Sequence, residues 1–433
     1  MQNSNIKILL FGSYFILSLA PIGIETSILS SNFENITIFF NFFRLIIPIV
    51  IFFLLYYLFF FKKLNTKKLL NTFFVFLFFV VIFLTTLLSL ENFNEGSKLL
   101  LPFYCINYIF LVFVALNTNE IKQKFNKFFF VQFIIITIIT LYSLFQYSYS
   151  FINLNLSDLY GLGIENDLYN QNSNGLSRVL LVISLFIFLV GKKNKYFFYL
   201  SCLIINTLII LLQSKLVLSF LFLFILLKTF LGKNIIKEKI KNIFFTLAIP
   251  VLIAILISMI NSSEKIPKIR LLSEFKYEMN SDNWIATKEY PNPITISSGF
   301  KTRFDTWKLI LQNSKKPFVG YGSQADKYIT RNLPKHTQIG ANSFIYAYAC
   351  AGLIGVISLI IVYYNIINLL LRAIFLRKSK SEFSNLKLFY CTILCFLIYR
   401  SFFENSFALW GIDFVLMINS YFGLKNILTK KIK

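Results

Sequence analysis

The sequence predicts an all-α, polytopic integral membrane protein with about 12 transmembrane helices and one large external loop that contains short helices. Composition is the first observation behind this prediction: apolar residues make up 57% of the 433 residues and charged residues only 14%, whereas about a quarter of a soluble protein is charged. The other two are a series of long apolar runs and an uneven distribution of Lys and Arg between them. We therefore interpret the formal net charge of +24 as a consequence of membrane topology, and not as a sign of nucleic-acid binding.

The apolar runs follow one another along the chain, each close to or above the roughly 20 residues that a helix needs to cross a hydrocarbon core. Eleven further runs follow the first one, and no clear small-residue cleavage site follows it. We therefore interpret the first run as a retained helix and not as a removed signal peptide. The twelve runs cover residues 8–28, 37–61, 69–90, 99–117, 128–152, 174–190, 196–213, 215–231, 243–260, 342–371, 388–404 and 407–424.

The distribution of Lys and Arg tests the number of runs and predicts their orientation. If the N-terminus is cytoplasmic, the segments on the cytoplasmic side hold 25 of the 43 Lys and Arg residues. The predicted outer loops 29–36 and 153–173 hold none. Because cytoplasmic loops of membrane proteins carry an excess of Lys and Arg, the sequence predicts a multi-pass protein with both termini in the cytoplasm.

Residues 261–341, between the ninth and tenth runs, form the predicted external loop of a single transmembrane domain that we expect to span residues 1–433. The loop carries 13 basic and seven acidic residues, which topology tolerates because long loops translocate largely regardless of charge. This excess is either a property of a solvated loop or a means of attracting an anionic ligand such as a lipid phosphate. A structureless loop of this length would be unusual, so we expect helices in it that pack on the bundle.

The end of this loop carries the strongest local signals. The helical spacing of Arg303, Trp307 and Ile310 predicts a short amphipathic helix with the arginine near its start. The sequence PFVGYG at Pro317–Gly322 predicts a break and a tight turn, because proline fixes φ and glycine permits backbone angles that other residues avoid. An apolar run resumes at Asn342, so this basic, turn-rich element is held at the membrane surface.

Several charged residues lie in or at the ends of apolar runs, where a charge at a helix centre costs about 3 kcal/mol even on a lenient scale. Arg178, Lys215 and Arg400 fall near the predicted outer face, on the same side as Arg303. Four cations on one side suggest one polyanionic ligand, and snorkelling to the interface is the alternative. Arg400 and Glu404 are four residues apart, so they can also pair with each other on one helical face.

An Asn-rich turn precedes the sixth apolar run. The sequence NQNSN at Asn170–Asn174 predicts a helix N-terminus whose free N–H groups point outward. Such an end can bind phosphate or sugar hydroxyls, or it can be an ordinary polar turn with an N-cap.

The cysteines and the common nucleotide and metal motifs do not suggest another site. The five cysteines lie mostly inside apolar runs and show no metal-ligand pattern with the single His336, so we interpret them as packing residues. The sequence contains no P-loop, no dinucleotide-binding fingerprint and no HExxH motif.

The order of these motifs resembles the O-antigen polymerase and O-antigen ligase family of bacterial surface-polysaccharide assembly. Members typically show an Asn-rich turn leading into a helix, matched by NQNSNGLSR, and a Ser-Arg pair that opens a later helix, matched imperfectly by Ser214 and Lys215. They then show a large external loop with an Arg followed by Trp and a P-x-x-G-x-G turn, matched by Arg303, Trp307 and PFVGYG. The loop ends in an Asn-initiated helix with Gly-x-x-Gly, matched by ANSFIYAYACAGLIG, and RSFFENS is similar to a segment found late in many polymerase-type members. The resemblance covers roughly residues 160–410.

The sequence departs from the family pattern at two places. The first departure favours a polymerase over a ligase, and the second weakens one motif. Ligase members usually carry a His immediately before the helix-initiating Asn, proposed as the base that activates the acceptor, whereas this chain has Ala341 there. His336 lies five residues earlier and is the available substitute. Lys215 keeps the charge of the family's Arg but loses its bidentate phosphate geometry.

The resemblance implies a glycosyl transfer that needs no metal or cofactor, on the outer face of the bacterial inner membrane. The donor would be an oligosaccharide linked to polyprenyl diphosphate, and the acceptor a sugar hydroxyl of another lipid-linked unit. Membrane lipid, a chain-length regulator and a flippase are the other expected partners, and nucleic acid is not. Fixed cations would lower the barrier, because negative charge grows on the diphosphate as it leaves.

The same resemblance suggests roles for particular residues. We expect Arg303 and Arg400 to be catalytic through their charge, and Glu404 to act as a base or to orient an arginine. The expected substrate-binding residues are Arg178, Lys215, Asn342, Tyr321, Asn174 and His336.

Two alternatives stay open. One is an O-antigen ligase that transfers the glycan to a lipid or protein acceptor, as in lipopolysaccharide assembly. The other belongs to a different class, a flippase or transporter of lipid-linked oligosaccharides. A transporter needs charges at the membrane midplane and usually has related halves, whereas the unusual charges here cluster near one face and no half is repeated.

Overall fold

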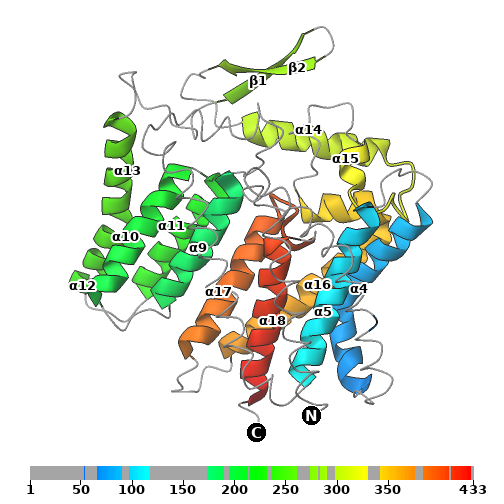
Figure 1. The fold of residues 1–433 in the computed structure, drawn as a ribbon, viewed down its shortest axis with the longest axis horizontal. Coiled ribbons are helices and arrows are strands. Elements are labelled where there is room, and N and C mark those ends of the chain that lie inside the picture. The colour runs from blue at the N-terminus through cyan, green and yellow to red at the C-terminus, as the bar shows by residue number, and fades with distance from the viewer. Residues whose placement is uncertain are drawn as a thin grey trace, which may run out of the picture. The chain divides into compact units, whose positions relative to one another are not determined.

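The structure is a computed structural model that describes residue 53 and residues 66–89, 97–117, 173–189, 195–212, 214–231, 236–260, 274–280, 283–289, 298–329, 342–375, 384–408 and 411–430 (Figure 1). These residues form helices and turns, apart from one antiparallel hairpin of β1 (Glu274–Asn280) and β2 (Asn283–Glu289). The predicted all-α class is confirmed in so far as this part of the chain is predominantly helical. The hairpin lies inside the loop where only helices were expected.

The chain divides into two compact units, which are described separately. Unit 1 combines residues 1–24, 35–132 and 299–433, and unit 2 combines residues 25–34 and 133–298. Segments distant in sequence therefore meet within unit 1, since its N-terminal helices pack with its C-terminal ones.

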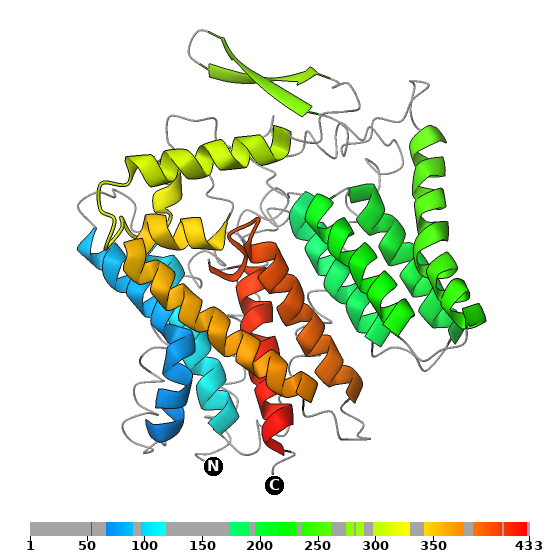
Figure 2. The same ribbon diagram turned by 180° about the vertical axis from the view of Figure 1, so that it is seen from behind.

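Unit 1 contains a bundle of long helices. Figure 2 shows α14 (Ser298–Asn313) lying across one end of this bundle, next to the short α15 (Ala325–Ile329). The bundle consists of α4 (Thr66–Leu88), α5 (Ser97–Asn117), α16 (Ser343–Phe375), α17 (Ser384–Ser401) and α18 (Ile412–Lys430).

Aromatic side chains fill the core of this bundle and join its N-terminal and C-terminal helices. The buried ring of Phe79 packs edge-on against Phe414, with 4.9 Å between ring centroids. Tyr108 and Asn419 are linked by hydrogen bonds of 3.0 and 3.2 Å between their side chains. Burying large aromatic side chains is strongly favourable, so α18 is firmly attached to α4 and α5.

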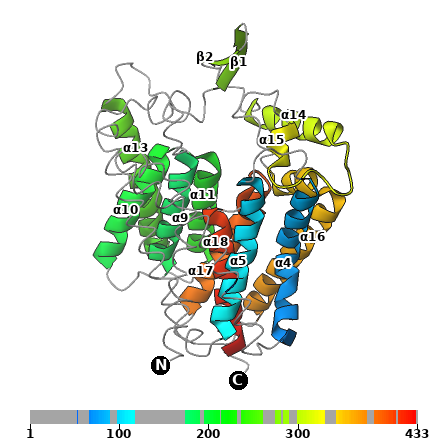
Figure 3. The same cartoon turned by 45° about the vertical axis from the view of Figure 1, so that its right-hand side comes forward.

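Unit 2 contains α9 (Ser173–Leu189), α10 (Lys195–Leu212) and α11 (Lys215–Leu231), followed by a continuous stretch that changes helix type. That stretch begins as α12 (Ile236–Ile243), becomes the π-helical segment η2 (Phe244–Ala248) and continues as α13 (Ile249–Ile260). Helix α10 packs against both α9 and α13, as Figure 3 shows.

The predicted apolar runs coincide closely with helices wherever the structure describes them. The runs at 8–28, 37–61 and 128–152 lie outside the described residues, apart from residue 53, and the other nine overlap helices. The run at 407–424 agrees least well, since it begins in the 3-10 turn η5 (Ser406–Ala408) and α18 starts only at Ile412. Among the described residues, Lys239–Leu256 and Ser343–Phe375 are helical stretches long and apolar enough to cross a membrane, and several shorter apolar helices accompany them. The number of crossings stays a prediction.

One predicted run needs a correction, because the run at 342–371 is not a single regular helix. Helix α16 is broken at Ala351 (φ −139°, ψ 16°) and Gly352 (φ 59°, ψ −152°). A short first helix therefore precedes a longer second one. The Gly-x-x-Gly sequence that ends at Gly355 marks this break, since a positive φ favours glycine.

Candidate functional site

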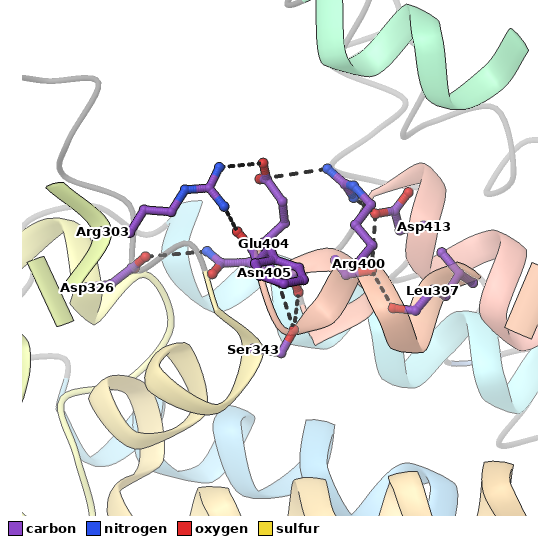
Figure 4. Close-up of polar contacts among 10 residues, drawn as sticks. Arg303, Asp326, Ser343, Leu397, Arg400, Glu404, Asn405 and Asp413 are labelled. Atoms are coloured by element: carbon purple, nitrogen blue, oxygen red, sulfur yellow. Dashed lines mark hydrogen bonds and ion pairs between the residues drawn. The ribbon is translucent and has the colours of Figure 1, made fainter. Parts of the chain in front are cut away.

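Helix α14 brings Arg303 to the segment that follows α17. Thr306 and Ile310 on α14 are buried and lie three and seven residues after the arginine, so they share one helical face with it. The Nη1 group of Arg303 donates a hydrogen bond to the carbonyl oxygen of Phe403 at 2.6 Å, and Nη2 lies 3.5 Å from Oε1 of Glu404 (Figure 4). The predicted helix is confirmed, although it begins at Ser298, five residues before Arg303.

Glu404 lies just beyond the C-terminal end of α17. The backbone N–H groups of Phe403 and Glu404 both donate to the carbonyl oxygen of Arg400, each at 2.9 Å. The other carboxylate oxygen of Glu404 lies 3.8 Å from Nη2 of Arg400. The predicted pairing of Arg400 with Glu404 is therefore confirmed, although the glutamate stands in the turn after the helix.

Arg400 lies between two carboxylates. Its Nη1 group forms a close ion pair with Asp413 at the start of α18, and Ser406 donates a 3.2 Å hydrogen bond to the same aspartate oxygen. The Arg400 and Asp413 side chains are 6% and 2% exposed, whereas those of Arg303 and Glu404 are 33% and 23% exposed. The cluster thus has a buried end and an end that solvent or a ligand can reach.

The charges of this cluster balance one another, since two guanidinium groups face two carboxylates. The expectation that four cations surround one anionic ligand stays a prediction, and Arg303 and Arg400 each already have a carboxylate partner within the protein. Arg178 lies in α9 and Lys215 is the first residue of α11, both in unit 2. The structure brings together Arg303, Arg400 and Glu404 in unit 1.

Asn342 and Ser343 begin α16 and contact the turn after α17. Asn342 Oδ1 accepts hydrogen bonds from the N–H groups of Phe344 (2.8 Å) and Ile345 (3.2 Å), which makes it the N-cap of α16. Its Nδ2 group donates to the carbonyl oxygen of Phe402 at 2.8 Å. The Asn342 amide, which we expected to bind substrate, thus makes hydrogen bonds within the protein.

The PFVGYG turn fits into the break of α16. The N–H groups of Tyr321 and Gly322 donate to the carbonyl oxygens of Ala349 (3.0 Å) and Cys350 (2.7 Å), before the break. In the other direction, Leu353 N–H donates to the carbonyl oxygen of Pro317 at 2.8 Å, after the break. Backbone groups that the broken helix leaves unpaired are satisfied in this way by the turn.

Glycine is required where these two backbones meet. Gly320 and Gly352 have φ values of 70° and 59°. A Cβ atom on Gly320 would lie 2.4 Å from the backbone nitrogen of Ala351, and one on Gly352 would lie 2.3 Å from the backbone carbon of Phe318. The predicted turn is confirmed, and its glycines also permit close contact with α16.

Tyr321 holds the turn together internally. Its hydroxyl group accepts a 2.8 Å hydrogen bond from the backbone N–H of Lys315, and the ammonium group of Lys316 lies 5.5 Å from its ring centroid. These contacts connect the end of α14 to the turn, so Tyr321 helps to set where α14, and with it Arg303, lies.

Sequence reasoning missed four polar residues of this region. Asn405 Nδ2 donates to Oδ2 of the buried Asp326 at 3.4 Å, and Ser343 Oγ donates to the carbonyl oxygens of Glu404 and Asn405 (Figure 4). Asp413 carried a usable signal, because it is an acid inside the apolar run 407–424 and intramembrane charges mark functional sites. The other three are ordinary polar residues in sequence and show their role only through contacts.

Besides Lys215, two further predicted residues have no described side chain. Asn174 lies in the first turn of α9, and His336 lies outside the described residues, as does Ala341. Within the described part of the chain, no group of three or more His, Cys, Asp or Glu side chains is arranged to hold a metal ion.

Comparison with known proteins found no family model that matches this chain and no matching curated protein.

Proposed function

We propose that this chain is a multi-pass membrane glycosyltransferase that polymerises oligosaccharide repeat units linked to polyprenyl diphosphate on the outer face of the bacterial inner membrane. The observation that carries the proposal is the ion-pair cluster in which Arg303 of the predicted external loop pairs with Glu404, which also pairs with Arg400, and Arg400 in turn pairs with Asp413. Arg303 provides a partly exposed cation and Glu404 a partly exposed carboxylate, which are the two kinds of group that this transfer needs.

Arg303 is the group that would meet the diphosphate. Its side chain is one-third exposed and forms an ion pair with the partly exposed carboxylate of Glu404, an interaction worth about 1 kcal/mol or less. A diphosphate carries more negative charge and offers several oxygens for bidentate contact. The donor can therefore replace Glu404 as the partner of Arg303, which leaves the carboxylate available to the acceptor.

The reaction then needs one bond to form and one to break. The acceptor hydroxyl oxygen attacks the anomeric carbon of the donor, and the bond from that carbon to the diphosphate oxygen breaks. Glu404 accepts the proton of the hydroxyl, and Arg303 stabilises the negative charge on the released polyprenyl diphosphate. Arg400 contacts neither substrate in this scheme; held by the buried Asp413, it positions the carboxylate of Glu404.

The second half of α16 supports a position in the membrane. Exposed apolar residues recur at alternating spacings of four and three residues after the break, so they form one continuous stripe along the helix. At 1.5 Å per residue the stripe is about 32 Å long, close to the roughly 30 Å of a hydrocarbon core. Its members are Leu353, Ile357, Ile360, Tyr364, Ile367, Leu371 and Ile374.

Helix α14 lies across the end of the same bundle in Figure 2, so it would lie parallel to the membrane surface if the bundle spans the membrane. This arrangement suits an enzyme whose donor and acceptor are both anchored in lipid. It also agrees with the positive-inside pattern, which places the loop 261–341 outside.

Reconstitution tests this proposal directly. The purified chain in lipid nanodiscs, given a synthetic repeat unit on polyprenyl diphosphate, should form products that lengthen by one repeat unit and release polyprenyl diphosphate. Glu404→Gln should abolish this activity at normal folded yield. A wild-type protein that forms no glycosidic bond with repeat units taken from its own organism would refute the proposal.

Deletion of the gene separates a polymerase from a ligase. A polymerase predicts loss of long chains, with single repeat units still attached to the final carrier. Long chains stranded on polyprenyl diphosphate would instead indicate a ligase, and would make His336 the next residue to replace.

A further inference from the structure

We infer that Asn342 and Ser343 are positioning residues that hold the backbone of Phe402–Asn405 and thereby fix Glu404 between its two arginines. The inference rests on the proposed function for the role of Glu404, and on the hydrogen bonds below for its geometry. Neither residue contacts the reacting atoms; each acts through the turn that carries the carboxylate.

Four consecutive carbonyl groups in this turn accept hydrogen bonds from side chains of distant segments. Asn342 Nδ2 donates to Phe402 at 2.8 Å, and Arg303 Nη1 donates to Phe403 at 2.6 Å. The hydroxyl of Ser343 is shared between Glu404 (3.2 Å) and Asn405 (2.9 Å). We call these four carbonyls and their donors the carbonyl cradle.

The turn needs such a cradle because it follows the end of a helix. The last carbonyls of an α-helix, and those just beyond it, have no partner within the helix. Here α17 ends at Ser401, so the carbonyl groups of Phe402 and Phe403 lie beyond its helical hydrogen bonds, although the N–H groups of Phe403 and Glu404 still donate to the carbonyl oxygen of Arg400. Donors from α14 and α16 supply what the helix lacks, and they set the direction in which the Glu404 side chain leaves the backbone.

Aromatic packing brings the first turn of α16 to this position. Phe344 stacks on Tyr363, with 5.1 Å between centroids and 20° between planes, and lies 5.9 Å from the ring of Phe402. The hydroxyl of Tyr363 in turn donates to Ser401 at the end of α17. The two donors, Asn342 and Ser343, therefore stand on a helix start that is packed against the turn they hold.

The two functions of Asn342 can be separated by substitution. Its Oδ1 atom caps α16 while its Nδ2 atom holds Phe402. Asp and Ser are as favourable as Asn at an N-cap, because each offers an oxygen that accepts the cap hydrogen bonds. Neither has the separate amide N–H group that Asn342 donates to Phe402. Asn342→Asp and Asn342→Ser should therefore keep the helix start and lose the cradle contact, and the serine variant does so without adding charge.

Ser343→Ala removes the second donor, and the same helix offers a matched control. Ser358 also donates its hydroxyl to a carbonyl oxygen, that of Gly355 at 2.8 Å, and is equally buried. It belongs to the second half of α16 and has no contact with the cradle among its hydrogen bonds in the structure. Ser358→Ala therefore loses a buried hydroxyl–carbonyl bond within its own helix and leaves the hydrogen bonds of the cradle in place.

The experiment has two measurements on the full-length chain in nanodiscs. Hydrogen exchange of the peptide covering residues 400–408 should be at least about tenfold faster in Asn342→Ser and Ser343→Ala than in wild type and in Ser358→Ala. In the polymerisation assay, kcat should fall about 10- to 100-fold in the two cradle variants with little change in KM for the lipid-linked repeat unit, because small displacements of catalytic groups cost that much.

Each measurement tests a different part of the inference. Unchanged exchange in residues 400–408 would overturn the cradle whatever the activity. Faster exchange with wild-type kcat would overturn the positioning of Glu404. If wild type itself is inactive, the proposed function fails, and the exchange result alone decides whether the cradle exists.

Discussion

Both units contain a distorted helix, and they satisfy its backbone in different ways. In unit 2 the π-helical segment η2 is held by one neutral side chain: Asn206 Nδ2 donates to the carbonyl oxygen of Thr246 at 2.7 Å, and Asn206 Oδ1 accepts from Ser184 at 2.7 Å. In unit 1 the break in α16 is filled by the backbone of the PFVGYG turn. The first arrangement stays within a bundle, whereas the second connects the bundle to the loop that carries Arg303.

The difference shows how structural and functional polar groups can be told apart. Ser184, Asn206 and Thr246 are neutral and almost fully buried, as expected of contacts that stabilise packed helices. Arg303 and Glu404 are charged and partly exposed, and such pairs contribute little stability. The contribution to stability therefore accounts for the hydrogen-bonded residues Ser184, Asn206 and Thr246 of unit 2. It accounts poorly for the partly exposed pair in unit 1, which favours a chemical role for that pair.

The largest expected effect is at the buried end of the cluster. Asp413→Asn leaves the buried Arg400 without its principal anion, so the free energy of unfolding should fall by about 3–5 kcal/mol. Thermal unfolding in detergent measures this loss. The double variant Arg400→Leu with Asp413→Leu removes both charges and should be less destabilised; if it is equally unstable, the cost does not come from an unpaired charge.

The next effect should appear in rate more than in stability. Arg303→Ala should lower the polymerisation rate by about 100- to 1000-fold, as removal of one transition-state donor does, while the free energy of unfolding changes by about 2 kcal/mol or less. Arg303→Lys keeps the charge without the bidentate geometry and should be intermediate. If Arg303→Ala polymerises at nearly the wild-type rate, Arg303 has no chemical role, and the contrast with the structural polar groups of unit 2 is lost.

Replacement of a glycine in the turn tests the connection between loop and bundle. Gly320→Ala should destabilise unit 1 by about 3 kcal/mol, because a positive φ costs an L-residue about 1–2 kcal/mol and the new Cβ meets backbone atoms of α16. The activity of the remaining folded protein should also fall, since Arg303 moves with the turn. The exposed Val319→Ala in the same turn is the control and should change neither stability nor activity appreciably.

The smallest effect is expected in unit 2. Asn206→Leu leaves the carbonyl of Thr246 and the hydroxyl of Ser184 without this partner, which should cost about 2 kcal/mol of unfolding free energy. The rate per folded molecule should stay as in wild type. A selective fall in kcat at unchanged folded yield would show that η2 takes part in the reaction, and the contrast between the units would need revision.

Much of the local structure could be predicted because it depends on neighbouring residues. The apolar run 69–90 became α4, the run 99–117 became α5, and the runs from 174 to 231 became α9, α10 and α11 with nearly the same limits. Helical spacing identified α14, and proline and glycine identified the turn at 317–322. Apolar length and backbone preference act over a few residues, so the sequence displays them directly.

The candidate site could be predicted only in part. Arg400 and Glu404 were recognisable because charges in or at the ends of apolar runs are unusual. Arg303 was recognisable from its helical spacing with Trp307 and from the motif order that resembles the O-antigen polymerase and ligase family. Ser343 and Asn405 were not, because their partners lie 61 and 79 positions away and no local pattern marks them. The break in α16 was missed for the same reason, since a run of apolar residues is indistinguishable from a regular helix until the turn that fills its gap is known.

For the part of the chain that the structure describes, the sequence by itself determined the predominantly helical class and the positions of most helices, and it predicted a basic loop between apolar runs. Only the tertiary structure decided which charges meet, that Asp413 holds Arg400, and that the turn and α16 complete each other's hydrogen bonding. The physical reason is one of range. Hydrophobic periodicity and backbone angles are local, whereas the pairing of buried charges and backbone groups depends on which distant segments the fold brings within about 3 Å of one another.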